Sequence, residues 1–84
     1  MVEKGLIEVY VPVLQRAFDI FIPLELPMYE TIELIKKAVR ELSDGRFQPD
    51  GSTVLCHYAD GRILDINLSA IELEIHHGSK LMLI

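Results

Sequence analysis

Hydrophobic and polar residues alternate in two segments near the start of the chain. Residues 6–12 and 17–24 both show this period of two, and both are rich in β-branched and aromatic side chains, as is typical of strands. Because only residues 13–16 separate the two segments, we expect an antiparallel hairpin with a short turn. The positions that this pattern assigns to the core are Ile7, Val9, Val11, Phe18, Ile20 and Ile22.

The spacing of apolar residues becomes helical after Pro23 and Pro27, which cannot continue the hydrogen bonds of a strand. A single apolar stripe then extends over four turns, which predicts an amphipathic helix. Residues 43–45, Ser-Asp-Gly, provide a stop, because glycine readily adopts the left-handed conformation found after helices. The stripe consists of Met28, Ile32, Ile35, Val39 and Leu42.

Shorter elements follow the helix. A hairpin turn is expected at Asp60 and Gly61, and Ser69 is placed to cap a single helical turn. Residues 80–84 form the last predicted strand. The other elements in this half of the chain are a loop over residues 46–52, strands over 53–58 and 62–66, and a turn over 76–79.

These elements follow one another as two strands, a helix, two strands, a short helix and a strand, within one domain of residues 1–84. This order predicts the α+β class, with a mixed sheet of four to five strands packed on one long helix. If the last strand inserts parallel to the first, both of its edges are paired. In this half of the chain, alternation assigns to the core Val54, Cys56, Ile63, Leu81 and Leu83.

The composition narrows the class of protein. The 84 residues, of which 50% are hydrophobic, suffice for one small core and not for a deep cleft between domains. No apolar run approaches the roughly 20 residues of a membrane span, and no secretory signal precedes the first strand. We therefore expect a cytoplasmic protein without membrane insertion. A net charge of −5 argues against nucleic-acid binding.

The residues with potential chemistry form no catalytic group in the sequence. Cys56 is the only cysteine, which excludes a disulfide within the chain and a four-cysteine zinc site. Cys56 and His57 are neighbours in a predicted strand and point to opposite faces, so they do not make a nucleophile–base pair. His76 and His77 are two ligands where zinc needs three or four. We expect no enzyme activity, no cofactor and no metal.

Three segments of the chain resemble ubiquitin. Residues 31–39 (TIELIKKAV) are similar to the start of its helix, residues 58–63 (YADGRI) to the turn before its fourth strand, and residues 75–83 (IHHGSKLML) to its last turn and strand. The resemblance implies a β-grasp fold, in which the strand order across the sheet is second, first, fifth, third. Ubiquitin also binds partners through the outer face of its sheet, which is the face without the helix.

Two further segments resemble the YukD-like proteins within this superfamily. They are residues 22–28 (IPLELPM), a proline-rich approach to the helix, and residues 78–84 (GSKLMLI), an ending of the form Gly-Ser/Asp-x-Leu-x-Leu. YukD-like proteins are small bacterial proteins that accompany type VII secretion systems. The resemblance implies a cytosolic accessory or regulatory protein that binds secretion components and is not an enzyme.

The outer face of the predicted sheet is apolar, although such a face is normally polar. An apolar row across four strands would form a patch of the size associated with partner surfaces. The alternative is that these cross-strand contacts only stabilise the sheet. The residues predicted to bind a protein partner are Tyr10, Phe21, Leu55, His57, Met82 and Ile84.

The sequence stops at Ile84, inside the last predicted strand. Ubiquitin-like modifiers and sulfur carriers resemble each other in needing a mobile Gly-Gly tail that enters an activating enzyme. We therefore expect a non-conjugating interaction module. Two alternatives stay open. One is a sulfur carrier or ubiquitin-like modifier whose Gly-Gly tail is absent from this sequence, and the other is a homodimer that uses the same apolar row.

Overall fold

The first two predicted strands are present and pair as a hairpin. The computed structural model describes residues 3–84, and β1 (Lys4–Val11) and β2 (Arg16–Pro23) are antiparallel neighbours. The turn between them is a short 3₁₀ helix, η1 (Pro12–Leu14), followed by Gln15 in the left-handed conformation with a φ of 53°. The Gln15 N–H closes the turn by donating to the carbonyl of Pro12.

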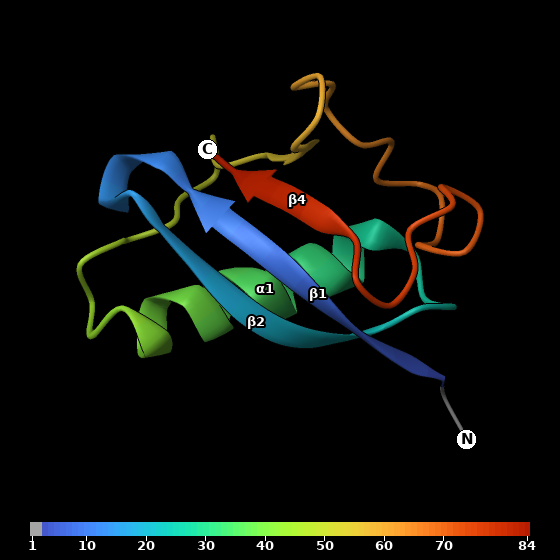
Figure 1. The fold of residues 1–84 in the computed structure, drawn as a ribbon, viewed down its shortest axis with the longest axis horizontal. Helices are drawn as coiled ribbons and strands as arrows, with labels where there is room; N and C mark the ends of the chain where they lie inside the picture. The colour runs from blue at the N-terminus through green and yellow to red at the C-terminus, as the bar shows by residue number, and fades with distance from the viewer. Residues whose placement is uncertain (1–2) are drawn as a thin grey trace.

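The last strand completes the sheet by inserting between two others. β4 (Lys80–Leu83) pairs in parallel with β1 on one side and antiparallel with β3 (Leu55–His57) on the other. Within residues 3–84 the sheet has four strands in the order β2-β1-β4-β3 (Figure 1). The α+β class and the predicted strand order are confirmed, because the last strand of the chain lies beside the first.

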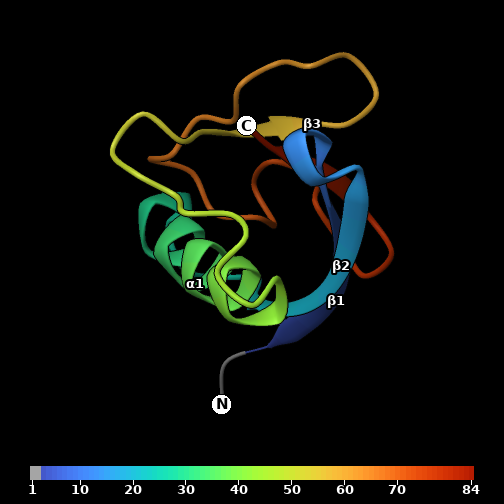
Figure 2. The same ribbon diagram turned by 90° about the vertical axis from the view of Figure 1, so that its left-hand side faces the viewer.

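One long helix covers a single face of this sheet. α1 (Met28–Leu42) crosses the strands, and the view in Figure 2 shows that it leaves their opposite face uncovered. Leu42 is the exposed member of the predicted stripe, with 51% of its surface accessible. The prediction that Leu42 is buried is wrong. The spacing of residues shows which side of the helix faces the sheet, but it does not show whether the sheet is long enough to cover the last turn. The fully buried members of the stripe are Met28, Ile35 and Val39.

Both ends of α1 are satisfied by backbone groups. At the start, the Tyr29 N–H donates to the carbonyl of Ile66 at 2.9 Å, so a segment distant in sequence caps the helix. At the end, Gly45 adopts a φ of 76° and its N–H donates to the carbonyl of Arg40. The predicted helix stop is confirmed.

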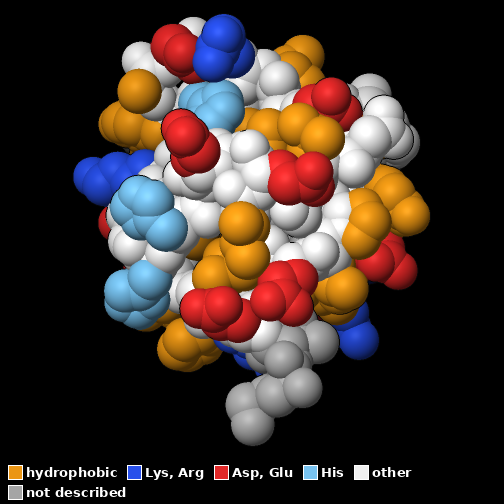
Figure 3. Space-filling view, turned by 90° about the vertical axis from the view of Figure 1, so that its right-hand side faces the viewer, with side chains coloured by type: hydrophobic (Ala, Val, Ile, Leu, Met, Phe, Trp, Pro, Cys, Tyr) orange, Lys and Arg blue, Asp and Glu red, His pale blue; other side chains and the backbone are white. Residues whose placement is uncertain are grey.

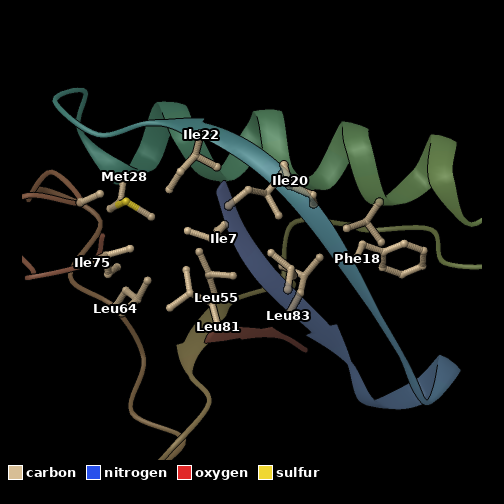
Figure 4. Close-up of a cluster of buried hydrophobic side chains, with 14 of the residues drawn as sticks. Ile7, Phe18, Ile20, Ile22, Met28, Leu55, Leu64, Ile75, Leu81 and Leu83 are labelled. Atoms are coloured by element: carbon tan, nitrogen blue, oxygen red, sulfur yellow. The ribbon is translucent and has the colours of Figure 1, made fainter. Parts of the chain in front are cut away.

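The core lies between α1 and the sheet and extends to the irregular segment before β4, which consists of residues 58–79. Figure 4 shows side chains from the strands, the helix and this segment meeting in one cluster. Leu64 and Ile75 belong to the irregular segment and are 4% and 3% exposed. All of the hairpin positions assigned to the core are buried there, namely Ile7, Val9, Val11, Phe18, Ile20 and Ile22.

The predicted phase of alternation is wrong in β3. Leu55, expected on the outer face, pairs with Leu83 and is 2% exposed within the core. Cys56 is fully buried, as expected, but its pairing with Met82 directs it to the outer side of the sheet and not toward the helix. Val54 is only partly buried. A shift of one residue moves every side chain of a strand to the other face. The run Val-Leu-Cys contains no polar residue that would fix the phase.

The strand predicted over residues 62–66 is reduced to one bridge. Ile63 pairs with Cys56, and the Leu64 N–H donates to the carbonyl of Leu55 at 3.0 Å. Ile63, assigned to the core, is 65% exposed, whereas Leu64 is buried. The phase is wrong by one residue here as well, because this segment pairs with β3 and follows its register.

Two predicted turns before β4 are present. Ser69 and Glu72 cap each other, since the Ser69 N–H donates to Glu72 Oε1 at 2.9 Å and the Glu72 N–H donates to Ser69 Oγ at 3.1 Å. The turn over residues 76–79 is attached to β1, because the Leu6 N–H donates to His77 Nδ1 at 3.1 Å. This attachment places the start of β4 against β1.

Replacing Leu55 with alanine tests the register of β3. Because Leu55 is packed in the core, Leu55→Ala leaves a cavity, and we expect the free energy of unfolding in urea to fall by about 2–5 kcal/mol. Leu34→Ala makes the same change at a helix position that is 50% exposed, and it should cost less than about 1 kcal/mol. Equal losses in the two variants would contradict the core position of Leu55.

Candidate protein-interaction surface

The outer face of the sheet lies opposite α1, and its residues follow from the strand pairing. Residues paired across neighbouring strands point to the same side, so each set of partners forms a row. One row aligns Ala17, Tyr10, Met82 and Cys56 near the end where β1 and β4 finish. The next row, which we term the charged row, consists of Asp19, Glu8 and Lys80.

A group of four apolar residues lies at the end of the sheet where β1 and β4 finish, and three of them are on its outer face. We term the group of Tyr10, Val13, Met82 and Ile84 the distal patch. Tyr10 and Met82 are paired and partly buried, and Ile84 lies in phase with Met82 and is 50% exposed. Val13 lies in η1 directly after β1 and is 75% exposed. Because β1 and β4 are parallel, η1 and Ile84 lie at the same end of the sheet (Figure 1).

Tyr58 lies beside the distal patch and links it to the charged row. Its ring meets the ring of Tyr10 edge to face, with centroids 5.7 Å apart and an interplanar angle of 84°. Lys80 Nζ lies 5.7 Å from the Tyr58 centroid and 3.5 Å from Glu8 Oε2. An apolar centre with a polar rim is the usual anatomy of a protein interface.

Phe21 lies apart from the distal patch on the same face. It is 65% exposed and pairs with Leu6, and the charged row separates it from Tyr10. Tyr10 pairs with Ala17, four residues from Phe21 along β2, which corresponds to about 13 Å. The predicted continuous apolar row across four strands is therefore not formed, and the face has two separate apolar features.

Two of the six residues predicted to bind a partner do not lie on the outer face. Leu55 packs in the core beside Leu81, as Figure 4 shows. His57 pairs with Leu81, a core residue, so its side chain leaves the sheet on the helix side, where it is partly buried. Both placements are wrong because of the one-residue shift in β3. The other four lie on the outer face, namely Tyr10, Phe21, Met82 and Ile84.

Val13 belongs to the distal patch and Tyr58 lies beside it, but the sequence pattern singles out neither residue. An available signal for Val13 is its position in a turn, where polar and small residues are usual. The contact of Tyr58 with Tyr10 joins segments far apart in the chain and depends on the register of β3. No local pattern could have placed that ring.

Cys56 is fully buried, and burial raises the pKa of its thiol. The thiol is therefore protonated at neutral pH and a poor nucleophile. His57 leaves the strand on the opposite side of the sheet and cannot act as its base. The adjacent cysteine and histidine thus do not combine into a reactive pair.

The side chains and helices of residues 3–84 also bear on two other kinds of site, a metal centre and a membrane span. This part of the chain contains no group of three or more His, Cys, Asp or Glu side chains arranged to hold a metal ion. His77 instead has a structural contact, because its Nδ1 accepts the Leu6 N–H. None of the helices formed by these residues has the length and hydropathy that a membrane span requires.

Solved structures with this architecture include ubiquitin-like domains of type VII secretion proteins. The ubiquitin-like domain of the type VII secretion system protein EccD1 of Mycobacterium tuberculosis matches with a TM-score of 0.78 and 18% identity over 98% of each chain. The EccD5 ubiquitin-like domain from Mycobacterium xenopi matches at 0.71 with 20% identity, over 98% of this chain and 93% of that one. The protein has the ubiquitin-like β-grasp fold. No protein-family model and no curated protein matches its sequence.

This β-grasp domain also resembles part of a larger assembly. A chain of the MycP5-free ESX-5 inner membrane complex matches with a TM-score of 0.69 and 17% identity, over 96% of this domain and 20% of that chain. Identities this low establish the fold alone, and one fold serves many functions.

The pH dependence of the free energy of unfolding at alkaline pH tests the burial of Cys56. Because burial raises the pKa of this thiol above its ordinary value of 9.0, the folded protein keeps the proton to a higher pH than the unfolded chain. The stability that this difference provides is present below pH 9 and is lost as the pH rises through the folded-state pKa. We expect the free energy of unfolding to fall more steeply above pH 9 in the wild type than in Cys56→Ala. Parallel pH profiles would contradict a buried thiol.

Proposed function

We propose that this β-grasp domain is a non-catalytic, non-conjugating docking module of a bacterial type VII secretion system, which acts on the cytoplasmic side of the membrane. The distal patch is the observation that supports docking, because it exposes apolar side chains at one end of a sheet face that α1 leaves uncovered. The proposed partner is a protein component or regulator of the secretion system.

The assignment to type VII secretion draws on similarity of two kinds. Two structurally similar domains belong to EccD proteins, and a third similar chain is part of the ESX-5 inner membrane complex. In sequence, residues 22–28 and 78–84 resemble YukD-like accessory proteins. The structural similarity favours an association with the secretion complex, and the sequence resemblance favours an accessory or regulatory role for the domain.

The distal patch is suited to docking because its central side chains are already ordered. Tyr10 and Met82 are held by paired backbones, and the ring of Tyr10 also packs against Tyr58. Ordering these groups before binding lowers the entropy lost in the complex. The adjacent ion pair between Lys80 and Glu8 would form part of a polar rim, which orients a partner more than it increases affinity.

The double substitution Val13→Ser with Ile84→Ser tests this surface. Both side chains are at least half exposed, so the change should leave the fold intact while removing apolar contact area. We expect co-purification of the tagged protein with the type VII inner-membrane complex of its host to fall at least about tenfold. Phe21→Ser should have a smaller effect, because Phe21 lies beyond the charged row.

Leu34→Ser is the matched control, because Leu34 is also 50% exposed but lies on α1, away from the outer face. It should co-purify as the wild type does. If the double variant is retained as well as the wild type, the distal patch is not the docking surface. If neither the wild type nor any variant co-purifies, the assignment to type VII secretion is wrong.

A further inference from the structure

A shallow hollow of about 590 Å³ lies at the end of the sheet where β1 begins, whereas the distal patch lies where β1 finishes. Lys4, the first residue of β1, is six residues from Tyr10 along the strand, which corresponds to about 20 Å. The hollow is therefore separate from the proposed docking surface. Its lining residues are Glu3, Leu24, Ile71, Glu74, Ile75 and His76.

Backbone hydrogen bonds hold the lining of this hollow in place. The Leu24 N–H donates to the Glu3 carbonyl at 2.9 Å, and the Ile71 N–H donates to the Leu24 carbonyl at 3.0 Å. The Glu74 N–H in turn donates to the carbonyl of Ile71 at 3.0 Å. Segments far apart in the sequence are thus joined into one frame, and little backbone ordering remains to oppose the binding of a ligand.

The most buried part of the lining is apolar. Leu24 and Ile75 are 7% and 3% exposed and belong to the core. Ile71 is 49% exposed, so it offers aliphatic surface to a ligand in the hollow. The stem of a long charged side chain can pack on such a surface while its polar head stays at the rim.

The rim is acidic, because the lining includes Glu3 and Glu74 and contains no lysine or arginine. Among the described residues, no ion pair includes either glutamate. Residues 17–35 and 63–79 also lack lysine and arginine. Lys4 follows Glu3, but its side chain points to the outer face because side chains alternate along a strand. A ligand in the hollow therefore meets a negative potential. Figure 3 shows this side of the molecule, where acidic side chains flank hydrophobic ones.

His76 adds a hydrogen-bond acceptor to the lining. Its Nδ1 lies 2.9 Å from the carbonyl oxygen of His77, and a carbonyl can only accept, so Nδ1 carries the proton of this hydrogen bond. In the neutral ring, Nε2 is then left as an acceptor. Ionised carboxylates also only accept. The side chains of the lining thus favour a group that has several donors and no acceptor.

We propose that this hollow binds an arginine side chain of a partner protein. The guanidinium, which has five N–H donors and no acceptor, would face Glu3 and Glu74. Its aliphatic stem would pack against Leu24 and Ile71. Arginine fits this lining better than lysine, because its planar group is more weakly hydrated and can donate to two carboxylates at once. The domain then contacts partners at both ends of the sheet.

The test is a titration of the ¹⁵N-labelled full chain with a short synthetic peptide that has one central arginine. We expect amide shifts at Leu24, Ile71, Glu74 and His76, and weaker binding at high salt. The same peptide with citrulline, which keeps the shape of arginine without its charge, should bind at least about fivefold more weakly. The absence of shifts, shifts confined to the distal patch, or equal binding of the citrulline peptide would overturn the proposal.

Matched variants separate the hollow from the overall acidity of the domain. Glu3→Gln with Glu74→Gln should weaken binding of the arginine peptide at least about fivefold. Glu25→Gln with Glu30→Gln removes the same charge from exposed positions that do not line the hollow, and it should change the affinity by less than about twofold. Equal weakening by the two double variants would overturn the hollow as the site.

The backbone of Glu74 allows a check that separates binding from folding. Glu74 has a φ of 61°, a left-handed conformation that glycine adopts without strain. Glu74→Gly should therefore lose peptide affinity while its urea midpoint stays at or above that of the wild type. Unchanged affinity in this variant would overturn the role of Glu74. Val13→Ser with Ile84→Ser should bind the peptide as the wild type does, so the hollow and the distal patch can fail independently.

Discussion

The parallel pairing of β4 with β1 is the constraint on which the other features of this domain depend. It brings the last residues of the described chain to the centre of the sheet, and the turn before β4 secures it. In that turn the Gly78 N–H donates to the Leu6 carbonyl, and the Glu8 N–H donates to the carbonyl of Ser79. The resulting register sets Val9 beside Leu81 on the core side, and it sets Tyr10 beside Met82 on the outer side. The core and the distal patch are thus two sides of one pairing, and a slip of one residue would exchange them.

The two sides of the sheet have different roles because one helix covers only one of them. On the helix side, α1 and the irregular residues before β4 complete the core. On the outer side, the charged row divides the exposed surface into the distal patch and the separate Phe21. This division gives the patch a polar boundary, which favours a partner of limited footprint over a broad apolar association.

The sequence predicts the hairpin and the helix well, because their periodic patterns are long, whereas the strand order was implied by the resemblance to ubiquitin. It fails in β3, where Val54, Leu55 and Cys56 form a continuous apolar run and only the pairing with Leu83 and Met82 decides which side chain is buried. Of the four predicted surface residues that lie on the outer face, Tyr10 and Phe21 belong to strands with a clear alternation. Met82 and Ile84 belong to a continuous apolar run, and the pairing of β4 with β1 decides which of its side chains face outward. The sequence does not reveal that the charged row separates Phe21 from the distal patch, because the row forms only when three strands are aligned in the sheet.

The central claim is that the distal patch contacts a component of a type VII secretion system. Site-specific photo-cross-linking in the host tests it most directly, with benzoylphenylalanine placed at position 84 in the distal patch and, in a separate variant, at position 34 on the exposed side of α1. We expect a cross-link from position 84 to a subunit of the secretion complex and none from position 34. A cross-link from position 34 alone, or from neither position in cells that assemble the complex, would contradict the claim.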